Sequence, residues 1–247
     1  MSNRPSAILT FHSLDESQSV ISFPPALFRR QLQSLRESGI PVVPLDRILS
    51  EPGSVSITFD DGFVNLLEHA VPALVELQMP ASVFVVSAYC GARNNWPTQP
   101  AGRVPDLPLM DWSQLRDLPQ SIEIGAHSRT HPDLRTLPLQ KSEQEMVQCR
   151  DEVQQRLGRA VTSIAYPYGA SSPEIRSIAR THFRLAVGTE LTYLSRDSDP
   201  FDLPRLDAYY LRSRPSLEGL FKPSTRAYVA FRNALRSSRL AVSGSHS

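Results

Sequence analysis

Short apolar runs alternate with amphipathic segments along most of the chain, and this alternation limits the folds open to it. The run Ala81–Ser87 is valine-rich and apolar at its centre, which is typical of a parallel strand covered on both faces. Apolar residues at helical spacing precede it from Leu66 to Leu77, where Pro72 is expected to break or kink the helix. Several strand and helix pairs of this kind predict an α/β fold whose parallel sheet is closed, or nearly closed, into a barrel.

Length and charge set further limits. With 247 residues and 40% hydrophobic content, the chain can bury one large core without dividing into several domains. Its net charge of +1 gives no reason to expect a nucleic acid as partner. The first residues lack the apolar region of a signal peptide, and no stretch is apolar over the roughly 18 residues of a membrane span. Cys90 and Cys149 are far apart in the sequence, which fits a reduced compartment. These features predict a cytoplasmic protein.

The run from Ser54 to Gly62 ends in two adjacent carboxylates. Its first six residues alternate between polar and apolar side chains, as in a pleated strand, so Asp60 and Asp61 are expected at a strand tip. Two like charges held together usually need a cation, or a raised pKa on one of them. Taken alone, an Asp-Asp-Gly sequence is more often a simple turn.

A second cluster further along the chain favours a metal site. His127 and His131 are four residues apart, the spacing of one helical turn, so that both rings can face one point. Two imidazole nitrogens and one carboxylate, with an open fourth position, form the usual catalytic zinc site. Together with the Asp60–Asp61 pair, the histidines predict a divalent metal ion. Zn²⁺ is the default, with cobalt, nickel and manganese as alternatives.

Three segments, 58–62, 127–131 and 166–169, resemble ordered motifs of the polysaccharide deacetylases, which are carbohydrate esterase family four with its NodB-like homology domain. The resemblance covers about residues 5–210. It implies a distorted (β/α) barrel and a metal-dependent hydrolase of carbon–nitrogen bonds other than peptide bonds. Such an enzyme removes N-acetyl groups from amino sugars of a polysaccharide, an oligosaccharide or a lipid-linked precursor. The N-acetylated saccharide would be its substrate, and residues 1–220 its catalytic domain.

The resemblance also implies roles for individual residues. By position in the motifs, Asp61, His127 and His131 are the metal ligands and Asp60 is the catalytic base. The ion would lower the pKa of a water molecule, and Asp60 would take its proton. A backbone N–H near Tyr168 would help to hold the oxyanion of the tetrahedral intermediate.

The sequence departs from the family pattern at two places. Ala165 stands where many members carry an arginine, and we expect Arg205 to reach Asp60 from a neighbouring strand end instead; a surface arginine is the alternative. The late Leu-x-His motif, whose histidine is the general acid in many members, is not found. His12, at the end of the first predicted strand, is expected in the active site without a firm assignment as the acid, and a structural histidine is the alternative.

Two aromatic positions have two interpretations each. Asp111-Trp112 loosely resembles a further motif in which an aspartate orients the catalytic histidine, although a helix cap explains it equally well. Trp96, in a predicted long loop from Tyr89 to Leu109, could stack on a sugar face.

Beyond Leu220 the chain carries five lysines and arginines and no acidic residue. Residues 221–247 are therefore expected to form a basic amphipathic helix and a disordered tail, which begins at Ser243. Docking of this helix on the barrel is favoured over contact with a membrane surface or a partner. Two other functions stay open, a deacylase of a small amide and a catalytically silent sugar-binding barrel, and the sequence does not fix the oligomeric state.

Overall fold

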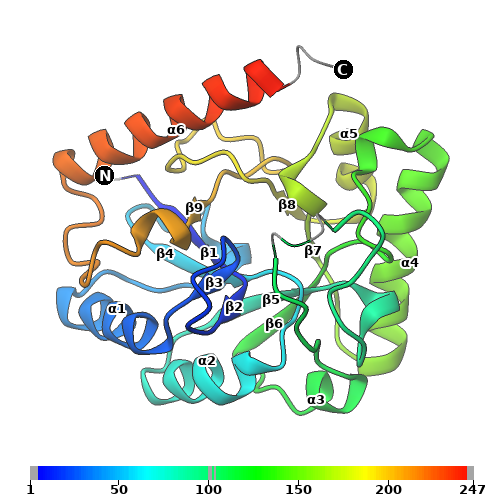
Figure 1. Cartoon of the computed structure of the whole chain (residues 1–247), viewed down its shortest axis with the longest axis horizontal. Helices are drawn as coiled ribbons and strands as arrows, with labels where there is room; N and C mark the ends of the chain where they lie inside the picture. Colours follow the sequence, from blue (N-terminus) through cyan, green and yellow to red (C-terminus); the bar gives the residue numbers. More distant parts are fainter. Residues whose placement is uncertain (1–4, 100–101, 103, 244–247) are drawn as a thin grey trace.

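The computed structural model describes residues 5–99, 102 and 104–243, which fold around one curled parallel sheet (Figure 1). The order of its seven strands is β8-β7-β6-β5-β4-β1-β9. The strands are β1 (Ala7–Phe11), β4 (Val55–Phe59), β5 (Ala81–Val85), β6 (Ile122–Ala126), β7 (Ser163–Ala165), β8 (Leu185–Val187) and β9 (Leu206–Asp207). A separate parallel pair joins β2 (Ser13–Leu14) to β3 (Ser22–Phe23).

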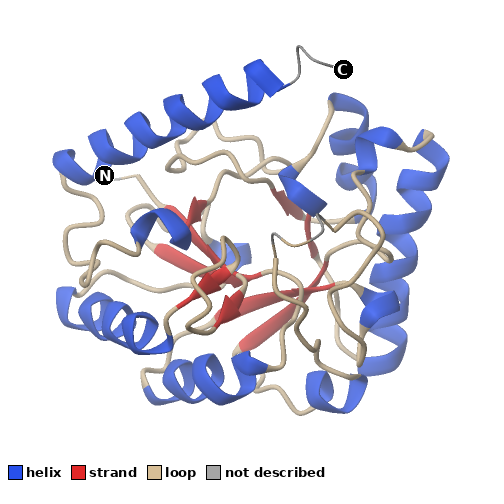
Figure 2. Ribbon diagram, in the orientation of Figure 1, coloured by secondary structure: helices blue, strands red, loops and turns tan. Residues whose placement is uncertain are grey.

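Helices surround this sheet, as Figure 2 shows. The α-helices are α1 (Pro25–Ser38), α2 (Asn65–Glu76), α3 (Trp112–Arg116), α4 (Leu139–Leu157), α5 (Pro173–His182) and α6 (Pro223–Ser243). Short 3-10 helices lie at Leu45–Arg47, Ser87–Tyr89, Leu134–Thr136, Pro167–Gly169 and Ala208–Leu211. In the described part of the chain, no helix has the length and apolar character that crossing a membrane requires.

One segment brings the two edges of the sheet together. Leu203 pairs with Val187 of β8, and Leu206, three residues later, pairs with Leu9 of β1. The sheet is therefore the nearly closed barrel that the sequence predicts. β9 was not predicted, because its two residues are too few to show an alternating pattern.

The central strands are buried on both faces, as their apolar runs predict. All five residues of β1, β4 and β5 are buried. An aromatic cluster covers one side of β1, where the ring of Phe11 lies 5.1 Å from those of Phe23 and Phe28 and 5.6 Å from that of Phe59. Rings at these separations add to the stabilisation that burial of apolar area provides.

Of the two effects expected of Pro72, a break or a kink in the helix, the break does not occur in α2. The helix continues through Pro72 to Glu76. Proline removes one backbone hydrogen bond, but the buried face of α2, which includes Leu66 and Leu74, packs on the core on both sides of it. Tertiary packing therefore outweighs the local effect of the proline.

α6 packs against the barrel, as the sequence favours. Val229 is buried, the Tyr228 hydroxyl donates to the carbonyl of Tyr210 at 3.0 Å, and Arg236 donates to the carbonyl of Thr189 at 2.6 Å. α6 ends at Ser243, the first residue of the predicted tail, and the rest of that tail lies outside the described residues.

Candidate active site

The side chains singled out by the sequence gather at one rim of the barrel. His12 follows β1, the Asp60–Asp61 pair follows β4, His127 follows β6 and Tyr168 lies just beyond β7. All these strands are parallel, so their carboxyl ends lie on the same side of the sheet. This is the rim at which barrel enzymes carry their chemistry.

Three side chains converge on one point at this rim. Asp61 Oδ1 lies 3.5 Å from the Nε2 atoms of both His127 and His131, and the two Nε2 atoms lie 3.3 Å apart. Atoms that bind one tetrahedral ion at the usual zinc distances are about 3.3–3.6 Å from one another. Asp61 Oδ1 is buried and has no hydrogen-bond partner in the described structure, an arrangement that a cation would satisfy. The donor set therefore fits a divalent metal ion.

The two histidines do not converge by helical spacing, so that part of the sequence interpretation is wrong. No helix covers residues 127–133. Instead, Ser128 and His131 adopt left-handed backbone conformations, with φ of 62° and 59°. Asp61 has the same type of conformation, with φ of 70°. Such conformations are costly for residues with a β-carbon and cluster at functional sites.

A carboxylate of α4 holds the loop between the two histidines. Glu145 Oε2 accepts hydrogen bonds from the backbone N–H groups of Arg129 (2.9 Å) and Thr130 (2.7 Å). Its Oε1 accepts one from the Thr130 hydroxyl at 2.8 Å. Glu145 was not among the predicted site residues, because the sequence of a polar helix gives no sign of a contact with a loop outside it.

We expect Glu145→Gln to weaken metal binding by about tenfold, since residues behind metal ligands typically contribute at least this much to affinity. The glutamine side chain would place its own N–H donors against loop groups that are themselves all donors, so some of these hydrogen bonds would be lost. Titration of the metal-free protein with Zn²⁺ in a calorimeter measures the change. Glu143→Gln is the control on the same helix, because Glu143 pairs with His182 instead. Equal affinities of the two variants would remove Glu145 from this role.

Different contacts orient the two imidazole rings. His127 Nδ1 donates to the carbonyl of Ala165 at 2.8 Å, which leaves Nε2 free to face Asp61. The ring of His131 stacks on Trp96, with centroids 4.1 Å apart and planes at 26°, and meets the edge of Tyr168 at 4.7 Å. Burial lowers the pKa of His131 well below its usual value and so favours the neutral ring that binds metals.

These contacts settle the two open aromatic interpretations. The side chain of Trp96 is only 3% exposed, so it supports His131 and presents no face to a sugar. Asp111 caps α3 by accepting from the N–H of Gln114 at 2.8 Å, as the capping alternative predicts. The carbonyl of Ala165, not Asp111, orients His127.

Arg205 makes the contact with Asp60 that the sequence predicts. Its two terminal nitrogens donate to the two carboxylate oxygens, each at 2.7 Å, and Arg205 is fully buried. The guanidinium also donates to the carbonyl of Gly188 and to the Thr10 hydroxyl. Burial by itself raises the pKa of Asp60, but the charges of Arg205 and His127 outweigh it and hold that pKa well below its usual value.

His12 lies on the open side of this pair. Its Nε2 is 3.8 Å from Asp60 Oδ2, and 26% of its side chain is exposed. Tyr168 is also partly exposed beside His131, with φ of 59° and 42% exposure, and its hydroxyl donates to Thr98 Oγ1 at 2.8 Å. The structure therefore brings all seven predicted site residues to one rim. Their catalytic roles stay predictions.

The turn at Tyr168 depends on Gly169. A β-carbon added there would lie 2.0 Å from Thr189 Oγ1, and φ is +66°. Gly158 has almost the same φ, +65°, but open space around its added β-carbon. We expect Gly158→Ala to lower the free energy of unfolding by about 1 kcal/mol through strain alone. Gly169→Ala should cost about 1–3 kcal/mol more through overpacking. Urea denaturation of both variants measures the difference, and equal losses would contradict the steric account.

Comparisons with known proteins agree with this geometry. The model of the family described as polysaccharide deacetylase matches residues 49–183. The Bacillus subtilis (strain 168) protein YxkH, itself assigned to the polysaccharide deacetylases, is 25% identical over 222 residues, which are 86% of this chain and 72% of YxkH.

Two solved structures share the fold. IcaB from Ammonifex degensii has a TM-score of 0.71 and 22% identity, over 85% of this chain and 95% of that one. The Streptococcus pyogenes deacetylase PplD, in complex with acetate, has a TM-score of 0.68 and 21% identity, over 83% of this chain and 91% of that one. With its family model matching more than half of its length, the chain belongs to the polysaccharide deacetylases, which are hydrolases of carbon–nitrogen bonds other than peptide bonds.

Proposed function

We propose that this protein is a metal-dependent N-deacetylase that acts on N-acetylated amino sugars of a polysaccharide, an oligosaccharide or a lipid-linked precursor. Residues 1–220 form its catalytic domain, and residues 221–247 are an accessory segment. The observation that carries the proposal is the buried Asp61, His127 and His131 group beside the Asp60–Arg205 pair. The cytoplasmic location stays a prediction from the sequence.

In this proposal Asp61, His127 and His131 hold the metal ion, with Zn²⁺ as the default. When bound, such an ion acts as a Lewis acid and lowers the pKa of water at neutral pH. Asp60 receives the proton of the attacking water at a carboxylate oxygen. Arg205 keeps that carboxylate ionised and fixes its orientation through two hydrogen bonds.

The remaining steps use the open side of the site. The water oxygen adds to the acetamide carbonyl, and the carbon–nitrogen bond then breaks to give acetate and a free amine. His12 is close enough to Asp60, and exposed enough, to donate a proton to the leaving amine. The backbone at Tyr168 supplies an N–H for the developing oxyanion.

Acetate release from N-acetylglucosamine oligomers tests the proposal. The metal-free protein should release none, and added Zn²⁺ should restore release. If the protein binds one metal ion tightly but releases no acetate from any oligomer, the substrate is another amide and the proposed class is wrong. If the protein binds no metal ion, it is instead the catalytically silent sugar-binding barrel.

A further inference from the structure

The outer face of α6 is apolar, which is unusual for a helix on the surface of a domain. Its inner face buries Thr225 and Val229 against the barrel. On the opposite face, Phe231 is 60% exposed and Leu235 is 41% exposed. Ala227, Ala230 and Ala234 are exposed beside them, and Ser224, two turns before Phe231, is a small polar residue on the same stripe. A helix that served only to cover the barrel would present polar side chains here.

Charge is segregated onto the same helix. Residues 222–247 contain five lysines and arginines and no acidic residue, although the whole chain has a net charge of only +1. The rest of the chain therefore carries a net charge of −4. Arg232, which lies over the Tyr210 ring, and Arg236, which donates to Thr189, hold the helix on the barrel, whereas Arg226 is exposed. A basic helix with an apolar stripe and no acidic residue has the composition of helices that lie in the interface of an anionic membrane.

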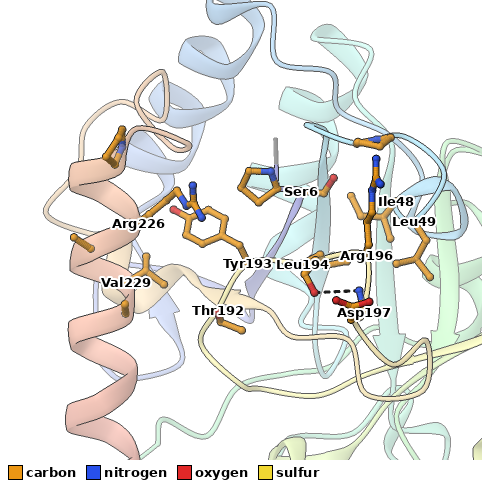
Figure 3. A pocket seen from close by; sticks show the side chains of 16 residues that line it. Ser6, Ile48, Leu49, Thr192, Tyr193, Leu194, Arg196, Asp197, Arg226 and Val229 are labelled. Carbon is orange, nitrogen blue, oxygen red and sulfur yellow. Dashed lines mark hydrogen bonds between the residues drawn. The ribbon is translucent and has the colours of Figure 1, made fainter. Parts of the chain in front are cut away.

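A cavity of about 750 Å³ adjoins the first half of this helix (Figure 3). Arg226 lies on its helix side, Arg196 comes from the loop after β8, and Leu49 is on the far wall. No ion pair of either arginine is found within the described residues. The cavity contains none of the predicted catalytic or metal-binding residues. It offers two cationic groups and one carboxylate, that of Asp197, next to apolar side chains such as Ile48 and Leu49.

We propose that the outer face of α6, with the cavity beside it, docks this protein on a membrane surface rich in anionic phospholipid. Phe231 and Leu235 enter the boundary between headgroups and acyl chains, and Arg196 and Arg226, both exposed, meet the lipid phosphates. A second copy of the chain is a poorer occupant, because two such faces would bring their positive charges together.

Docking through α6 would also bring the candidate active site near the membrane. Arg236 of α6 donates to the carbonyl (2.6 Å) and the hydroxyl (3.0 Å) of Thr189, and Thr189 contacts the turn that contains Tyr168. A saccharide carried on a lipid, or held at the membrane surface, would then lie within reach of the candidate active site. This last step rests on the proposed function, whereas the docking itself does not.

Co-sedimentation of the full chain with vesicles tests the docking. We expect binding to an equimolar mixture of phosphatidylglycerol and phosphatidylcholine, little binding to phosphatidylcholine alone, and weaker binding at high salt. Phe231→Ser should weaken partitioning by at least about tenfold, because it removes one large apolar side chain from the buried area. Val75→Ser is the control, since Val75 is a 50% exposed apolar residue on another helix.

Three outcomes would overturn the proposal. One is equal binding to the two kinds of vesicle, and another is a Phe231→Ser variant that binds like the unchanged protein. The third is a dimer in sedimentation analysis that Phe231→Ser converts to monomer while vesicles bind neither form. Acetate release from soluble oligomers should be unchanged in Phe231→Ser, so failure of docking and failure of the proposed activity are separable.

Discussion

Replacing Asp60 with asparagine should lower kcat by about 10²–10⁴-fold, the usual contribution of a general base. Asparagine keeps the size of the side chain and one acceptor for Arg205, but it cannot take a proton from water. Asp60 is not among the three residues that converge on the candidate metal position, so metal binding should persist. Acetate release and metal content of the purified variant measure the two effects.

Asp61→Asn is the matched control, because it changes the neighbouring carboxylate in the same way. Its expected defect is the opposite one, since Asp61 Oδ1 faces both His127 and His131. The primary defect of the Asp61→Asn variant should be a lower affinity for Zn²⁺. If Asp60→Asn lost the metal and Asp61→Asn kept it, the two carboxylates would have exchanged the proposed roles.

Removing Arg205 should have the largest effect on stability. Arg205→Met leaves the Asp60 carboxylate buried without its cation, and breaking a buried pair in this way costs about 3–5 kcal/mol of unfolding free energy. The exposed pair of Arg135 with Asp133 is also held by two hydrogen bonds. Arg135→Met should cost only about 0–1 kcal/mol, because water screens an exposed pair. Urea denaturation at neutral pH compares the two variants.

A double variant separates the contribution of the Arg205–Asp60 ion pair to stability from the contribution of Arg205 packing. Adding Asp60→Asn to Arg205→Met removes the unpaired buried charge, so the double variant should be more stable than Arg205→Met alone. A double variant that loses the sum of the two single losses would show that Arg205 stabilises the barrel through packing and its other hydrogen bonds. In that case the ion pair with Asp60 would not be the reason for its burial.

Much of the site follows from local sequence. The apolar runs of β1, β4 and β5 fix both the strands and their burial, because only a covered parallel sheet accommodates such runs. Asp60, Asp61 and His12 follow directly from the ends of those strands, since parallel strands place their carboxyl ends together. The prediction that the His127 and His131 rings face one point is confirmed, but the reason given for it is wrong, because left-handed turns, not a helical turn, bring the rings together.

Contacts between distant segments were decided only by the tertiary structure. Glu145 supports the histidine loop across 15 residues, and Trp96 supports His131 across 35, without a pattern that links either pair in the sequence. Arg205 could be proposed as the partner of Asp60 because Ala165 left a gap in the family pattern, but its burial depends on how the barrel closes. The sequence shows that α6 is amphipathic and basic. Only packing on the barrel determines which face remains outside, because burial of one face depends on residues far away in the chain.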